Sequence, residues 1–347
     1  MFLLSTDHRM QEHKQLRNAI TVLFVSAHLV LPATVRAADE TFTIQPTFAA
    51  GTDYVEWKRE GTIKTGANPM GPEKTVPTLQ LRGMKREVKS DAKGAAISLT
   101  FDRLKFTVDT MRGPVNFDSD TDMKPAPQNP LQFVAGPALG QSITMTVNPS
   151  TRAATLTGMD DLSLAIEEKA AGKFIFEPLM PDFTDDAAMF DWIDTQFAPC
   201  PSRPVKRGES WKTTIRHEHL GMGTLDLAYE CQLKSVEKVE GRNVATITYK
   251  GKITKPGNGR PGYRVFNTKL NFKDGHFDGE AQFDLQRGEF IDHSMHTHID
   301  AEAVMLLSSI DEPAVFEQVF DYTTTVKAMP MKDRKEQRSK AATSKAE

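Results

Sequence analysis

The feature that most constrains the fold is a long run of alternating apolar and polar residues between residues 208 and 301. Odd-numbered residues of 211–219 and 225–233 would share one face of an extended chain, and most of them are apolar or aromatic. A period of two is typical of a strand with one buried face. Further strands are predicted at 244–253 and on both sides of the turn at Arg287-Gly288. This stretch is therefore predicted to be an antiparallel meander.

A fainter copy of the pattern lies near residues 51–108 and again begins with a glycine followed three residues later by an aromatic residue, Gly51 and Tyr54. In the last strand of this copy the apolar set changes face near Asp102-Arg103, which predicts a bulge or a bend. Either the two meanders are related repeats, or they look alike because alternation specifies little.

The middle of the chain has the spacing of helices. Asp160-Asp161 begin one predicted helix, which ends at Gly172, and Thr184 caps a second one, which ends before Pro199. We therefore predict a mainly β fold of the α+β class. Its two antiparallel β-meanders would form a curved sheet or an open half-barrel, with two helices in the middle.

The N-terminus has the layout of a secretory signal peptide. Lys14 and Arg17 precede an apolar run at 19–31, and small residues permit cleavage after Ala37 or Ala38. An uncleaved membrane anchor is the alternative, but the run is short and interrupted. Translation starts at Met1 or at Met10. We expect a periplasmic or extracellular protein with no transmembrane segment after cleavage.

These patterns divide the chain into a signal peptide at 1–37, one two-lobed β-rich domain at 38–328, and a disordered basic tail at 329–347. Within the domain, lobe one covers about 38–157, the helical middle about 158–199, and lobe two about 200–328. A formal net charge of −3 gives no reason to expect nucleic acid as a partner.

Cys200 and Cys231 are the only cysteines, and both lie in the part predicted to be exported. In an oxidising compartment such a pair is expected to form a disulfide. The alternative is a pair of buried free thiols. Their spacing does not make a zinc site.

Several short motifs, in this order, resemble an uncharacterised family of exported bacterial proteins, a domain of unknown function common in planctomycetes. They span most of the chain after the signal: Gly51-x-x-Tyr54, residues 117–120 (FDSD), 143–148 (ITMTVN), 156–160 (LTGMD), 204–211 (PVKRGESW) and 279–284 (GEAQFD). The chain departs from the family at residues 149–151, where a glycine-containing turn is common. The resemblance implies export and a β-rich fold, and it implies no activity.

The candidate site residues are two His-x-His pairs, His217/His219 and His296/His298. Residues two apart on a strand face the same way, so each pair could offer two imidazoles to one zinc ion. Strand parity argues against a single shared site, because the first pair shares the face of Trp211 and the second lies opposite Met295. Solvated or locally hydrogen-bonded histidines are the alternative.

No nucleophile or phosphate-binding motif has a supporting context. The leading hypothesis is therefore a non-catalytic binding or interaction module of the cell envelope, with a hydrophobic small molecule or an envelope protein as partner. A metal-dependent hydrolase built on the four histidines and a structural scaffold with protein partners are the alternatives. The scaffold predicts a broad exposed apolar patch.

Overall fold

A computed structural model of the chain describes residues 40–69, 71–91, 94–110, 113–123, 132–148, 154–170, 197–219, 221–262, 268–306 and 312–343. Residues 42–347 belong to one compact unit. The predicted signal peptide and almost all of the second predicted helix lie outside the described residues. Among the described helices, none has the length and apolar content needed to cross a bilayer.

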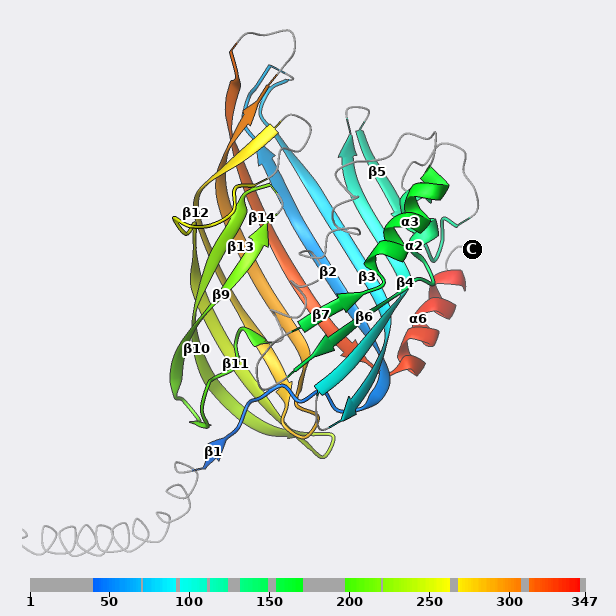
Figure 1. The fold of residues 1–347 in the computed structure, drawn as a ribbon, viewed down its shortest axis with the longest axis vertical. Coiled ribbons are helices and arrows are strands. Elements are labelled where there is room, and N and C mark those ends of the chain that lie inside the picture. The colour runs from blue at the N-terminus through cyan, green and yellow to red at the C-terminus, as the bar shows by residue number, and fades with distance from the viewer. Residues whose placement is uncertain are drawn as a thin grey trace, which may run out of the picture. The chain divides into compact units, whose positions relative to one another are not determined.

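The unit is built on one antiparallel sheet of 12 strands, which is not closed into a barrel (Figure 1). Along the sheet the strands follow the order β7-β6-β4-β3-β2-β14-β13-β12-β11-β10-β9, and β5 pairs with β4. The strands are β2 (Gly51–Thr65), β3 (Lys74–Asp91), β4 (Gly94–Thr110), β5 (Gly113–Asp118), β6 (Ser142–Val147), β7 (Ala154–Thr157), β9 (Ser210–His219), β10 (Gly223–Val239), β11 (Arg242–Thr254), β12 (Thr268–Asp284), β13 (Glu289–Met305) and β14 (Ala314–Met329). Two short strands, β1 (Thr41–Phe42) and β8 (Val205–Lys206), form a separate sheet.

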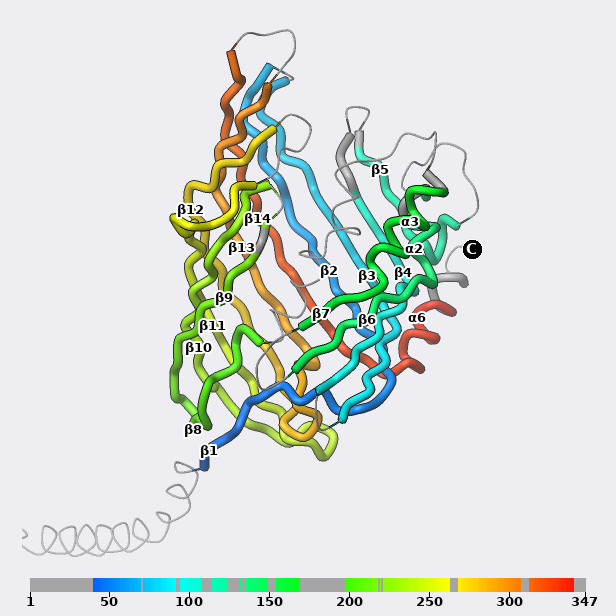
Figure 2. Tube along the Cα trace, in the orientation of Figure 1, coloured from blue at the N-terminus to red at the C-terminus, as the bar shows by residue number. Residues whose placement is uncertain are grey.

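The two predicted meanders are joined into this single sheet by β14, a strand that the alternation pattern did not single out. β14 lies beside β2 (Figure 2). The register places Thr324 opposite Arg59. The mainly β, curved and open architecture predicted from the alternation is confirmed. The predicted bulge is confirmed as well, because the register of β3 and β4 passes from Arg103 directly to Phe101 and leaves Asp102 out.

Glycines let the sheet curve where aromatic rings lie across a neighbouring strand. Gly279 is directly opposite Tyr249, and Gly251 is directly opposite Phe277. A Cβ atom at Gly251 would lie 2.2 Å from the Phe277 ring, and one at Gly279 would lie 2.4 Å from the Tyr249 hydroxyl. The rings therefore occupy the space that side chains at these positions would need.

Two separate apolar cores lie in the two halves of the sheet. The first half, β2 to β7, packs against α2 (Gln132–Ala138) and α3 (Met159–Ala170), which bury Leu162 and Ile166. The second half, β9 to β14, packs largely on itself and buries Tyr229, Phe277 and Phe283. The helix predicted from Asp160 is confirmed as α3.

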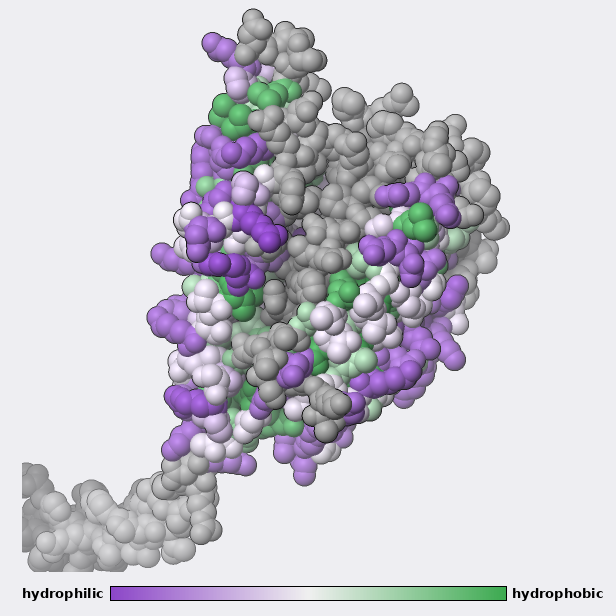
Figure 3. Space-filling model, in the orientation of Figure 1, coloured by the Kyte–Doolittle hydropathy of each residue, from purple (hydrophilic) through white to green (hydrophobic). Residues whose placement is uncertain are grey.

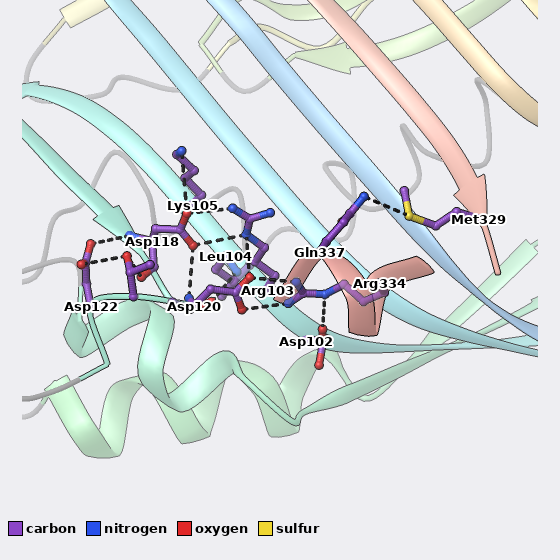
Figure 4. Close-up of polar contacts among 12 residues, drawn as sticks. Asp102, Arg103, Leu104, Lys105, Asp118, Asp120, Asp122, Met329, Arg334 and Gln337 are labelled. Atoms are coloured by element: carbon purple, nitrogen blue, oxygen red, sulfur yellow. Dashed lines mark hydrogen bonds and ion pairs between the residues drawn. The ribbon is translucent and has the colours of Figure 1, made fainter. Parts of the chain in front are cut away.

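The C-terminal segment differs from the sequence prediction. Residues predicted to be a disordered tail form helix α6 (Met331–Thr343). Its Arg334 is buried. The guanidinium donates hydrogen bonds to Asp102 Oδ2 and to both carboxylate oxygens of Asp120, each with a donor–acceptor distance of 2.8 Å (Figure 4). The guanidinium also lies over the Tyr54 ring, 5.3 Å from its centroid. The prediction was wrong because the stabilising partners lie more than 200 residues away in the sequence.

Candidate functional site

The strongest candidate site is a small pocket on one face of the second half, and β2 of the first half completes its lining. We call this the inner face, and it carries Trp57, Leu227 and Met295. Six strands line the pocket with 14 residues: Trp57 and Arg59 of β2, Ile215, His217 and His219 of β9, Leu225, Leu227 and Tyr229 of β10, Ile253 of β11, Met295, Thr297 and Ile299 of β13, and Tyr322 and Thr324 of β14. β2 and β9 are far apart in the strand order, so the sheet curls far enough to bring their side chains to one place.

The space left among these side chains is about 40 Å³. That volume holds a few water molecules, at about 15 Å³ of accessible space for each. It also fits a small polar group or the end of a hydrocarbon chain. A longer chain requires side chains to move apart, and Met295 is the most flexible of them. In Figure 3, hydrophobic residues show in the hollow of the sheet and hydrophilic residues along its outside.

Arg59 supplies the pocket with a fixed positive charge. Its guanidinium carbon lies 5.1 Å from the centroid of the Trp57 ring and 4.7 Å from that of Tyr322. Its Nε donates to the Thr324 hydroxyl at 3.4 Å. Cation–π contacts of this kind hold a guanidinium in place between aromatic faces. Arg59 is half-buried, and the sequence patterns did not single it out because its contacts with Tyr322 and Thr324 are made to β14, far away in the sequence.

Two threonines add neutral polar groups to the same pocket. Thr297 and Thr324 are each 3% exposed. Thr324 accepts from Arg59, whereas the buried Thr297 hydroxyl has no hydrogen-bond partner among the described residues. An unpaired buried hydroxyl costs about 1–3 kcal/mol, so such a group is normally satisfied by water or by a ligand.

The predicted histidines fall on opposite faces of the sheet. His217 and His219 line the pocket on the inner face. His219 Nδ1 accepts from the backbone N–H groups of Gly221 and Met222, at 3.2 and 3.3 Å. His296 and His298 alternate with the pocket residues of β13 and therefore point to the outer face. This placement confirms the parity argument and excludes one zinc site made from all four.

On the outer face, His296 and His298 flank the carboxylate of Asp321. His296 Nε2 and His298 Nδ1 each lie 3.1 Å from one of its oxygens, and the His276 ring stacks on His298 with centroids 5.1 Å apart. Hydrogen bonds from His298 and His296 hold the pKa of Asp321 below its ordinary value. Among the described residues, no group of three or more His, Cys, Asp or Glu side chains is arranged to hold a metal ion. The second pair is therefore locally hydrogen-bonded, and the four histidines are not gathered at one centre.

Next to the pocket, on the same inner face, lies a buried aromatic cluster that the sequence patterns did not single out. The Tyr249 hydroxyl donates to the Ser294 carbonyl at 3.0 Å and lies 2.7 Å from His293 Nε2. A phenol has one hydrogen, so the histidine nitrogen donates to it, which is the role of a neutral imidazole with its proton on Nε2. Burial lowers the pKa of His293 to about 4 and raises that of Tyr249 well above its ordinary value.

The predicted disulfide is wrong. Cys200 and Cys231 form no disulfide with each other, and both side chains are buried. Cys231 lies in the middle of β10, where its cross-strand partners are Trp211 and Tyr249, and both thiols belong to the core of the second half. Burial raises the pKa of Cys231 to about 12, so this thiol is an apolar packing group and not a nucleophile.

The motif at residues 117–120 has a structural role. Asp118 accepts from Arg103 at 2.8 Å, and Asp120 binds Arg103 at 3.2 Å in addition to Arg334 (Figure 4). Hydrogen bonds and charge from Arg103 outweigh the effect of burial and lower the pKa of Asp118. Asp120 therefore fastens α6 to β4, and both aspartates are already paired with arginines.

Comparison with known protein families gives a match for this chain. Residues 92–288 match a family of unknown function, DUF6263. No curated protein is similar enough to match. The predicted resemblance to a domain of unknown function is confirmed to that extent, while export and a bacterial distribution stay predictions. Because the match covers more than half of the 347 residues and runs through both halves of the sheet, the chain belongs to the DUF6263 family of unknown function.

Proposed function

We propose that this protein is an exported, non-catalytic binding module of the cell envelope that takes a hydrophobic ligand in the inner-face pocket. The observation that carries the proposal is the convergence of aliphatic side chains from four strands on one small pocket, namely Ile215, Leu225, Leu227, Ile253, Met295 and Ile299. Pockets with mostly apolar walls and a few polar groups are typical of small-molecule sites. The sequence prediction of export supports the cellular setting.

A scaffold with protein partners is less well supported. The large apolar side chains that are exposed among the described residues are Met123, Leu164, Val239, Leu306 and Val315. They lie on different elements in both halves and do not line the pocket. Isolated exposed apolar residues are normal on soluble proteins, whereas a docking surface needs a continuous patch.

The binding proposal is tested with N-phenyl-1-naphthylamine, an uncharged apolar fluorophore. Its fluorescence should rise on binding to the purified protein. Ile215→Glu places a charge in the pocket from the edge strand β9 and should weaken binding at least about tenfold, because burying an unpaired carboxylate is costly. Thr214→Glu adds the same charge on the exposed opposite face of β9 and should bind like the wild type.

Thermal unfolding of both variants checks that the fold is intact. The proposal is wrong if the wild type does not bind the fluorophore, or if Ile215→Glu and Thr214→Glu bind it equally. Export is tested separately by mass spectrometry of the protein isolated from its own cells. A mature N-terminus at residue 38 or 39 is expected, and an intact leader on soluble cytoplasmic protein would contradict export.

A further inference from the structure

We propose that the ligand of the inner-face pocket is an aliphatic molecule that carries a hydroxyl or a carbonyl oxygen, and that this oxygen pairs with the hydroxyl of Thr297. Thr297 is then the residue that selects the ligand, and the aliphatic side chains of β9, β10 and β13 hold its chain. This inference rests on the proposed binding function and adds the chemical class of the ligand.

The Thr297 hydroxyl is a buried polar group in the pocket lining. The residue is 3% exposed, and its hydroxyl has no hydrogen-bond partner among the described residues. β13 is paired on both sides, with Phe277 of β12 and Tyr322 of β14 directly opposite Thr297. The two ladders use the neighbouring backbone groups, so the pocket is where a partner for this hydroxyl can enter.

Other polar groups of the lining are bonded within the protein. Arg59 Nε donates to the Thr324 hydroxyl, and His219 Nδ1 accepts from two backbone N–H groups. A buried hydroxyl without a partner is costly, so a ligand gains more by pairing with it than by replacing a bond that already exists. Thr297 is therefore the polar group of the lining at which a ligand atom gains most.

The surroundings of Thr297 favour an oxygen attached to an apolar body over water alone. Its neighbours on the inner face include Met295 and Ile299 along β13 and Phe277 on β12, and none of these side chains has a nitrogen or an oxygen atom. A buried water molecule needs about three polar partners. A ligand hydroxyl or carbonyl is satisfied by fewer bonds, and the carbon atoms attached to it contact these apolar neighbours.

The size of the pocket suits a short ligand or one end of a longer one. The free volume is about 40 Å³, and Ile215, Leu225 and Leu227 line it from β9 and β10. A chain that extends beyond this space displaces these side chains as it enters. They carry no polar atoms, so their movement leaves no hydrogen bond unmade. The oxygen of the ligand thus fixes its position, and the aliphatic wall adapts to the length of its chain.

Three hexyl ligands test the inference: 1-hexanol, 2-hexanone and 1-chlorohexane, each below its solubility limit. Displacement of N-phenyl-1-naphthylamine gives their inhibition constants. Each ligand is compared between the wild type and Thr297→Val, because the three differ in their own affinity for water. Thr297→Val keeps the shape of the side chain and removes the hydroxyl. It should weaken the binding of hexanol or hexanone at least about fivefold, and should not weaken that of chlorohexane. The ligand that loses more affinity identifies a hydroxyl or a carbonyl.

Matched variants separate the hydroxyl from the shape of the site. Thr297→Ser keeps a hydroxyl and should retain the preference of the wild type. Thr323 alternates with the pocket residues Tyr322 and Thr324 and therefore lies on the outer face of the adjacent strand. Thr323→Val should bind all three ligands like the wild type. Without ligand, Thr297→Val should unfold at no lower temperature than the wild type, because it removes an unpaired polar group.

The outcomes separate the two proposals. If the wild type does not bind the fluorophore, the proposed binding function fails together with this inference. If the fluorophore binds and none of the three ligands displaces it, or if Thr297→Val weakens all three equally or none of them, the inference is overturned and the binding function stands. A clearly lower melting temperature of ligand-free Thr297→Val would mean that the hydroxyl is paired within the protein, and would overturn the inference in the same way.

Discussion

The two halves of this sheet bury their inner faces by different means. In the first half, helices α2 and α3 supply Ala135, Ala138, Leu162 and Ile166 to the core. The second half fills its own curvature, since rings such as Tyr249 and Phe277 lie over glycines of the neighbouring strand. The second half and the adjoining strand β2 line the pocket. Among the described residues, the strand-lined wall thus leaves a space, whereas the wall packed against α2 and α3 is filled by core side chains.

The halves meet at a buried charge cluster. Arg86 of β3 lies 2.7 Å from Asp53 Oδ1 of β2 and 2.8 Å from Glu289 Oε2 of β13. Arg287, at the turn before β13, lies 3.0 Å from Asp53. Burial raises the pKa of Glu289 even though Arg86 and Arg287 act to lower it. Strands from both halves therefore depend on one guanidinium.

Breaking this joint should have the largest effect. Arg86→Met leaves two carboxylates buried without their main counter-charge and should lower the free energy of unfolding by about 3–5 kcal/mol. Urea denaturation measures the loss. Lys89→Met is the control, because Lys89 is exposed on the same strand and pairs with the exposed Glu87. A control loss as large as that of Arg86→Met would mean that the buried cluster is not the cause.

Acid should weaken the second half through His293. Its pKa is about 4 in the folded protein and 6.5 ordinarily, so between these values the unfolded chain binds a proton that the folded chain does not. The free energy of unfolding should have its full value above about pH 6.5 and should fall by about 3 kcal/mol as the pH drops to 4. Urea denaturation at several pH values measures this.

The matched variants are His293→Gln, which should flatten the pH dependence, and His276→Gln, which removes an exposed histidine and should leave it unchanged. If the free energy of unfolding falls equally with pH in the wild type and in His293→Gln, the pH dependence does not come from His293.

Removing the α6 anchor should affect the first half alone. Arg334→Met should lower the free energy of unfolding by about 2 kcal/mol. The loss is smaller than for a buried charge left without any partner, because Asp120 keeps Arg103 as a partner. Hydrogen exchange should rise across residues 331–343 and not in β10–β12. Arg338→Met, on the exposed side of the same helix, should change neither quantity. Rapid exchange of the wild-type helix would instead support the predicted disordered tail.

The smallest effect is expected from overfilling the glycine positions of the second half. Gly251→Ala places a Cβ atom 2.2 Å from the Phe277 ring and from the Ala228 carbonyl oxygen. It should lower the free energy of unfolding by about 1–2 kcal/mol. At Gly257 a Cβ meets nothing within 4 Å, so Gly257→Ala should be close to neutral. Thermal unfolding compares the two variants. Similar melting temperatures would show that the rings do not depend on these glycines.

Much of the fold could be predicted because side-chain alternation is a local property. Each strand turns successive residues to opposite faces, so the sequence placed His217 with Trp211 and set His296 opposite Met295 without knowledge of any neighbour. The bulge at Asp102 was visible for the same reason, as a change of face within one strand. The start of α3 followed from acidic residues in its first turn.

The candidate site could not be predicted in the same way. Arg59 meets Thr324 across a separation of 265 residues, and its role depends on the pairing of β14 with β2. The disulfide prediction failed because it used the compartment and the number of cysteines, and neither determines whether two sulfur atoms meet. Buried groups such as His293 carry no mark in the sequence that separates them from exposed ones.

By itself, therefore, the sequence determined most of the strands apart from β14, their two faces, the bulge and the parity of the histidines, since all of these follow from chain geometry over a few residues. Only the tertiary structure decided how far the sheet curls, which strands meet in the pocket, that α6 is anchored and that the thiols stay apart. Those features depend on contacts between residues that are distant in sequence, and no local pattern encodes which distant residues become neighbours.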